Sequence, residues 1–202
     1  MIKTITLEWL QSEGACKESL EAWQKETDHD TFATLNRLID KNPKWGNWLV
    51  CRLMTKKQAV KYAVFAAEQV IDIYEKAYPD DKRPRNAIEA AKAYLKNPSK
   101  KTKAAAANAA SAASAAAYAA YAAADAAASA AADAAADAAA YAAAYASTSA
   151  YAAASATSAA SAAADAAADA AAYAAYADAA AYERRKMKAK ILKYGIRLLE
   201  QS

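Results

Sequence analysis

Apolar residues recur at helical spacing through the first hundred residues, and a capping residue precedes most of these runs. Phe32, Leu35 and Leu38 lie three residues apart behind Asp30, a residue type that favours the position before a helix. The pattern predicts helices that begin at a cap or a proline: a short one behind Thr6 that ends at Gly14, a second over about 15–26, a third behind Asp30 and a fourth from Pro43.

The next apolar run is longer. It follows Thr55, continues at helical spacing from Val60 to Tyr74 and stops before Pro79, so we expect one long helix here. A further helix over 85–95 follows a charged turn. The segment 97–99, Asn-Pro-Ser, is expected to end that helix and to start the next one.

Residues 104–181 keep the helical spacing with a different composition. Of these 78 residues 54 are Ala, none is Lys or Arg, and the Ser, Tyr and Asp residues fall mostly three or four apart. The unit 129–141 recurs unchanged at 161–173, and 147–149 is the expected turn between the copies. Because Ala is the best helix former, the chain is predicted to be all-α, as a multi-helix bundle or a solenoid-like stack of closely packed Ala-rich helices.

Composition divides the chain at about residue 104. All four Trp and both Phe lie in 1–103, which we expect to form an N-terminal helical region around a Trp/Phe core. Residues 104–202 hold the Ala/Tyr/Asp-rich helices and a basic C-terminal helix, whose apolar side includes Ile191, Leu192 and Leu199. We expect the two regions to form one structural unit.

Charge is segregated along the chain, whose formal net charge is +4. Residues 1–103 carry +5, 104–181 carry −6 and 182–202 carry +5. The N-terminal residues lack the apolar core of a signal peptide, and the long uncharged runs are Ala, Ser and Tyr rather than Leu and Ile. We therefore expect a cytoplasmic protein that does not enter a membrane, and the modest net charge disfavours nucleic acid as a partner.

Several kinds of chemistry are excluded by scarce residues. His29 is the one histidine, and Cys16 and Cys51 lie 35 positions apart, which argues against a disulfide framework, a zinc knuckle and most His-dependent catalysis. We expect no enzymatic activity and no cofactor. One alternative stays open, a carboxylate–metal hydrolase in which the repeated unit would supply Asp133, Asp137, Asp165 and Asp169, although that segment offers no basic residue to hold a substrate.

The candidate ligand-binding residues form a basic cluster around Pro84. Lys82, Arg83 and Arg85 precede a predicted helix start, where free N–H groups favour anions, and Arg adds bidentate recognition of phosphate. Arg184 and Arg185 could join the same patch. The alternatives are a solvated turn that offsets neighbouring acids, or a basic surface that holds the first region against the Asp-rich helices.

Three segments carry a resemblance to a known family. Residues 48–53, 63–70 and 80–91, followed by the Ala/Tyr/Asp-rich helices, resemble alanine-rich helical proteins found in bacteriophage genomes and among proposed immunity proteins of bacterial toxin systems. The similarity covers about residues 45–195, and 83–91 is its most specific part. The resemblance implies a non-enzymatic role in conflict between phage, bacterium and competitor, and it supplies no mechanism.

We therefore expect a binding protein that neutralises a partner, with anti-defence or immunity-like action. The alternative is a protein that sequesters a small phosphorylated or nucleotide signal. A protein partner predicts an exposed apolar face of Trp or Tyr, whereas a small anionic ligand predicts a cavity lined by Arg83, Arg85 and Tyr. The sequence leaves open whether the chain forms a homo-oligomer.

Overall fold

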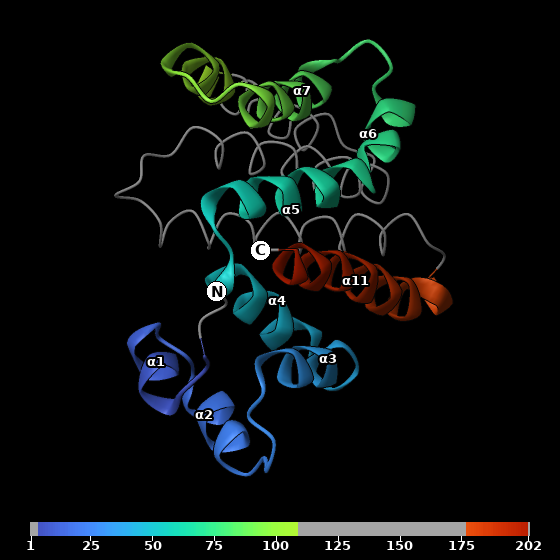
Figure 1. The fold of residues 1–202 in the computed structure, drawn as a ribbon. Helices are drawn as coiled ribbons and strands as arrows, with labels where there is room; N and C mark the ends of the chain where they lie inside the picture. Colours follow the sequence, from blue (N-terminus) through green and yellow to red (C-terminus); the bar gives the residue numbers. More distant parts are fainter. Residues whose placement is uncertain (1–3, 109–176, 202) are drawn as a thin grey trace.

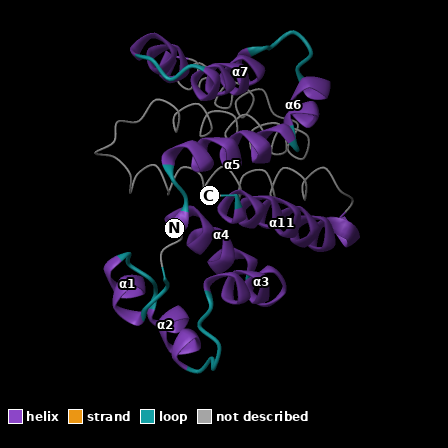
Figure 2. Cartoon of the chain, viewed as in Figure 1, coloured by secondary structure: helices purple, strands orange, loops and turns teal. Residues whose placement is uncertain are grey.

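The computed structural model describes residues 4–108 and 177–201, and every regular element in these residues is a helix (Figures 1 and 2). This confirms the all-α prediction. The Ala-rich repeats, their expected turn and the four Asp of the metal alternative lie outside the described residues. A helix that starts at residue 100 is described as far as residue 108. The other helices are α1 (Leu7–Ser12), α2 (Lys17–Gln24), α3 (Thr31–Lys41), α4 (Pro43–Leu53), α5 (Lys56–Glu68), α6 (Ile71–Ala77), α7 (Arg83–Lys96) and α11 (Ala177–Glu200).

The predicted helix starts behind Thr6 and Asp30 are confirmed, and in each case the side chain caps the helix. Thr6 Oγ1 accepts the N–H of Trp9 at 3.2 Å before α1, and Asp30 Oδ1 accepts the N–H of Ala33 at 2.8 Å before α3. Gly14 follows α1 with φ +79°, a conformation that favours glycine. Side-chain capping therefore fixes these two helix starts, as the sequence predicted.

The single long helix expected from Thr55 to before Pro79 is wrong. Thr55 and Gln58 form a capping box at the start of α5, but the helix stops at Glu68, and Val70 has non-helical angles (φ −131°, ψ −6°) before α6 begins. β-branched residues at 70 and 71 lower helix propensity, and the break lets both side chains be almost fully buried. Packing therefore overrides a continuous helical pattern.

Helix α7 also begins two residues earlier than expected. It starts at Arg83, which places Pro84 in the first turn. A proline costs nothing there because its missing N–H would have no partner within the helix. Arg83, which the sequence placed in the turn before the helix, is therefore a helical residue, as Arg85 was expected to be.

Helix α11 forms the centre of the core. It packs against α4, α5 and α3 (Figure 1) and buries its predicted apolar side, including Ile191, Leu192 and Leu199. Gly195 lies against the ring of Tyr62, whose hydroxyl donates to Asn47 Oδ1 at 2.7 Å. A helix from the second composition region thus completes the core of the first.

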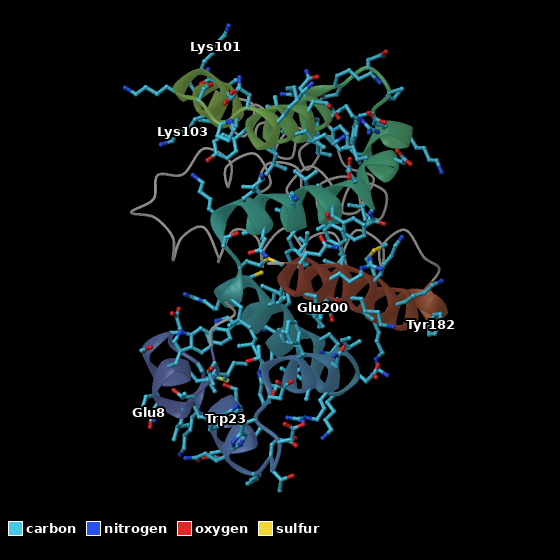
Figure 3. The ribbon with its side chains drawn as sticks, viewed as in Figure 1. Glu8, Trp23, Lys101, Lys103, Tyr182 and Glu200 are labelled. Carbon is cyan, nitrogen blue, oxygen red and sulfur yellow. The ribbon has the colours of Figure 1, made fainter. Side chains whose placement is uncertain are left out.

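Helices α1 and α2 form a hairpin at the opposite end of the described structure from α7 (Figure 1). Leu10 is the buried residue of α1, whereas α2 buries none of its side chains fully. Figure 3 shows Trp23 of α2 at this end with Glu8, far from Lys101 and Lys103. The face that α2 turns towards α3 and α4 is therefore incompletely packed.

Candidate functional site

The structure holds Arg83 on a carboxylate of its own chain. Its Nε and Nη2 donate to the two oxygens of Asp81 at 2.9 Å and 2.6 Å, and the hydroxyl of Tyr74 donates to Asp81 Oδ2 at 2.7 Å. The bonds from Arg83 are the main reason that the pKa of Asp81 lies well below its usual range. The pKa of Tyr74 is raised, first by burial and then by its bond to Asp81. Asp81 thus joins α6 to the start of α7.

Arg85 makes a second link between the same helices. Its Nε and Nη2 donate to Glu75 at 2.9 Å and 2.6 Å, and Nη2 also contacts Asp72 Oδ1 at 3.3 Å. Hydrogen bonding by Glu75 is the largest cause of the raised pKa of Arg85, and the same bond lowers the pKa of Glu75. A phosphate at Arg83 or Arg85 would have to compete with bidentate carboxylates that are already in place.

The remaining candidate cations do not extend this cluster. Lys82 is exposed at the position before α7, and Arg185 is exposed on α11. No hydrogen bond or ion pair among the described residues joins Arg185 to Lys82, Arg83 or Arg85. The side chain of Arg184 lies outside the described residues. The tyrosine expected beside the arginines is present, but Tyr74 is buried and bound to Asp81.

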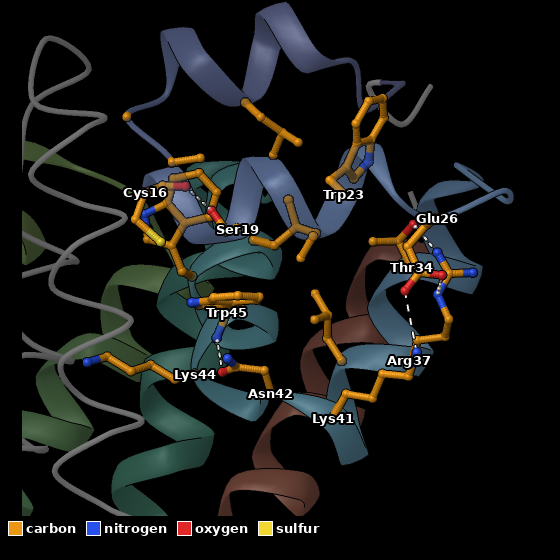
Figure 4. A pocket seen from close by; sticks show the side chains of 17 residues that line it. Cys16, Ser19, Trp23, Glu26, Thr34, Arg37, Lys41, Asn42, Lys44 and Trp45 are labelled. Carbon is orange, nitrogen blue, oxygen red and sulfur yellow. Dashed lines mark hydrogen bonds and ion pairs between the residues drawn. The ribbon is translucent and has the colours of Figure 1, made fainter.

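A cavity of about 500 Å³ lies between the α1–α2 hairpin and the α3–α4 pair (Figure 4). Its size falls in the range of pockets that enclose small ligands or partner side chains. Its lining is mostly apolar, with cations at the rim. The residues that line it are Leu10, Gly14, Ala15, Cys16, Ser19, Ala22, Trp23, Glu26, Thr34, Arg37, Leu38, Lys41, Asn42, Lys44, Trp45, Trp48 and Leu49.

Three tryptophans are the largest side chains that line the cavity. Trp45 and Trp48 lie three residues apart and so share one face of α4, while Trp23 comes from α2. Asn42 Oδ1 accepts the N–H of Trp45 at 3.1 Å and fixes the start of α4. The guanidinium of Arg52 lies 5.3 Å from the Trp48 ring centroid. In Figure 4, Trp45 lies at one end of the cavity and Trp23 at the other.

The loop after α2 folds back on Trp23. The rings of Trp23 and His29 stack at 3.8 Å, and His29 Nε2 lies 3.0 Å from the carbonyl oxygen of Trp23. The indole N–H of Trp23 is buried and has no hydrogen-bond acceptor among the described residues.

Ion pairs tie the hairpin to the helices beneath it. Arg37 of α3 donates to the carbonyl oxygen of Asp28 at 2.6 Å and lies 3.6 Å from Glu26, and Lys41 lies 3.4 Å from the same carboxylate. Near the other helix of the hairpin, Glu13 pairs with Arg52 at 3.3 Å. Partly exposed pairs of this kind contribute little stability, about 0–1 kcal/mol each. The hairpin is therefore held in place by ion pairs rather than by tight packing.

From the sequence, the tryptophans were expected in a core, and no cavity was predicted between 1–26 and 30–53. Trp45, Trp48 and Leu49 recur at helical spacing, a pattern shared by core residues and by a binding face. The cavity depends on how closely the α1–α2 hairpin approaches the α3–α4 pair, and no local sequence pattern encodes that distance. The signal available was an amphipathic segment at 15–26 whose apolar residues are mostly small.

No family model, curated protein or solved structure matches this chain. Within 4–108 and 177–201, no helix combines the length and apolar character needed to cross a bilayer, and no three acidic, Cys or His residues cluster as metal ligands. The arrangement that the described residues do provide is a half-open apolar cavity with a charged rim, which is a geometry for binding.

Proposed function

We propose that this protein is a non-catalytic binding protein that neutralises a partner protein, and that the tryptophan-lined cavity is where the partner binds. The observation that carries the proposal is the cavity itself, with Trp23, Trp45 and Trp48 on its walls. Tryptophan is enriched among the residues that dominate binding energy in protein interfaces. The part of the proposal that concerns conflict between phage, bacterium and competitor follows what the sequence resemblance implies and has no support from the structure.

The geometry favours this cavity over the basic cluster at Lys82, Arg83 and Arg85. The guanidinium donors of both arginines are directed at Asp81 and Glu75, so a small phosphorylated ligand would lose much of its binding energy in displacing them. The cavity requires no such displacement, because its walls are apolar and half open. Binding there gains free energy from burial of apolar surface.

The experiment compares the wild-type chain with Ala22→Phe, which places a ring in the cavity from a half-buried position on α2. Each version is expressed in bacteria that are challenged with a toxin-producing competitor, or infected with phage in a host that carries antiphage defences. We expect wild-type protein to raise survival or plaque number and Ala22→Phe to lose that effect while still folding. Equal effects of both proteins, or no effect of either in any challenge, would contradict the proposal.

A further inference from the structure

The rim of the cavity is basic, whereas its walls are mostly apolar. Arg37, Lys41 and Lys44 are its cations and Glu26 is its one carboxylate. Glu26 already lies between Arg37 at 3.6 Å and Lys41 at 3.4 Å, and Arg37 also lies 3.6 Å from the carboxylate of Asp28, so Arg37 is held by two acidic residues of its own chain. The mouth therefore presents a net positive charge around an apolar interior.

Lys44 is the cation best placed to contact a partner. It is exposed, and no hydrogen bond or ion pair to another described residue holds its ammonium group. In Figure 4, Lys44 and Lys41 lie on opposite sides of Asn42, so the two ammonium groups belong to different stretches of the rim. A single small anion would engage one of these stretches, whereas a longer segment with several carboxylates could engage both.

We propose, building on the function proposed above, that the cavity binds an acidic segment of a partner protein. Bulky apolar side chains of that segment enter between Trp23 and Trp45, and its carboxylates face Lys44 on one side and the exposed Lys41 on the other. The apolar anchors supply affinity, and the charged rim supplies specificity and a faster association rate.

Charge complementarity also explains why the charged residues lie at the rim and the apolar residues line the interior. An apolar cavity alone would accept any hydrophobic segment, including basic ones. Cations placed at the edge repel basic segments and attract acidic ones without adding buried charge to the floor. The apolar floor and the basic rim therefore select one chemical class of partner between them.

The test is a selection from a random peptide library displayed on phage, with the full-length chain immobilised. Parallel selections use Ala22→Phe, which fills the cavity, and Lys41→Glu/Lys44→Glu, which reverses two rim charges. The matched control is Lys57→Glu/Lys100→Glu, which makes the same change in net charge at exposed first-turn positions of other helices. Thermal unfolding verifies that each variant is folded before the selection.

We expect the enriched peptides to be acidic and apolar, to bind Ala22→Phe at least tenfold more weakly, and to bind Lys41→Glu/Lys44→Glu at least tenfold more weakly at low salt. The Lys57→Glu/Lys100→Glu control should bind like the wild type. Added salt should weaken binding to the wild type more than binding to Lys41→Glu/Lys44→Glu, since salt screens the rim charges.

The outcomes separate the two proposals. Enriched peptides that bind Ala22→Phe weakly but are neutral or basic would overturn the proposal of an acidic partner. Peptides that bind Lys41→Glu/Lys44→Glu as tightly as the wild type would also overturn it. Either result would leave the proposed binding function unaffected. A second measurement compares how far indole-3-acetate and the peptide each slow the alkylation of Cys16. If both slow it equally, a small aromatic anion is sufficient to occupy the cavity, and the acidic-segment proposal is overturned. Failure to enrich any peptide that distinguishes wild type from Ala22→Phe would contradict the binding function itself.

Discussion

Two glycines show how single residues set the packing of α11. A Cβ at Gly195 would lie 2.7 Å from Cε2 of Tyr62, and a Cβ at Gly46 would lie 2.6 Å from Cδ2 of Leu192. The two approaches are equally short, but the neighbours differ. Tyr62 is a fully buried ring whose hydroxyl is bound to Asn47, whereas the Leu192 methyl is the end of a flexible side chain.

We therefore predict that Gly195→Ala lowers the free energy of unfolding by about 1–3 kcal/mol, because the ring must move in a tightly packed core. This loss should appear although alanine is normally about 1 kcal/mol better than glycine inside a helix. Gly46→Ala should cost less. Urea denaturation measures both, and a more stable Gly195→Ala protein would show that α11 does not approach Tyr62 this closely.

Asp81 gives a pH-dependent prediction. Its pKa is lowered in the folded protein, chiefly by Arg83, so the ionised carboxylate adds stability above its ordinary pKa, and that stability is lost as the pH falls through the lowered value. Asp81→Asn should therefore destabilise the protein at pH 7, and the difference from wild type should shrink steadily below about pH 5. The exposed Asp80→Asn is the control. A difference that stays constant with pH would argue against the Arg83–Asp81 clamp.

At the scale of helices, α2 and α5 differ in how they are held. Helix α5 buries seven of its residues, including Ala63 at 0% exposure, whereas α2 buries none and borders the cavity through Ala22. Local stability follows the number of buried contacts, so α2 should open more often than α5.

A matched pair of substitutions tests this contrast. Ala22→Phe adds a ring where the structure has space and should leave the free energy of unfolding unchanged or raise it by about 0.5–2 kcal/mol. Ala63→Phe adds the same ring where there is none and should lower it by at least about 1–3 kcal/mol. Thermal denaturation compares the two. Equal losses at both positions would mean that the space beside α2 is already filled.

Helix starts were predictable because their signals are local. Thr6, Asp30, Pro43 and Thr55 each mark a start in the sequence, and each is followed by a helix in the structure. The break at Val70 was not predicted, since the apolar spacing continues through it and two adjacent β-branched residues are a weak local signal.

The candidate site was less predictable because it depends on contacts between elements. The sequence singled out Arg83 and Arg85 as bidentate donors, and they are, but their partners are carboxylates of the same chain. The partner of Arg85 is Glu75, ten residues away, and it comes within reach only when α6 and α7 fold against each other. The cavity similarly requires that two helical hairpins meet.

At the scale of the whole molecule, α11 packs against both α4 and α5 and joins them into one core. All four tryptophans lie in the first 48 residues, and none is in α11. We predict that Leu192→Ala lowers the free energy of unfolding by about 2–5 kcal/mol, the usual cost of a large-to-small change in a core. The loss should appear in tryptophan fluorescence and in helix content at the same midpoint. Separate transitions would mean that α11 unfolds independently of the first region.

The central claim, that the tryptophan-lined cavity binds the partner, is tested most directly by the alkylation rate of Cys16. This thiol is exposed and lines the cavity, whereas Cys51 is buried and serves as an internal reference. We predict that a saturating acidic peptide from the selection slows alkylation of Cys16 at least tenfold in the wild type and leaves Cys51 unreactive throughout. Alkylation of Cys16 at the same rate in the free and the peptide-bound protein would contradict the account.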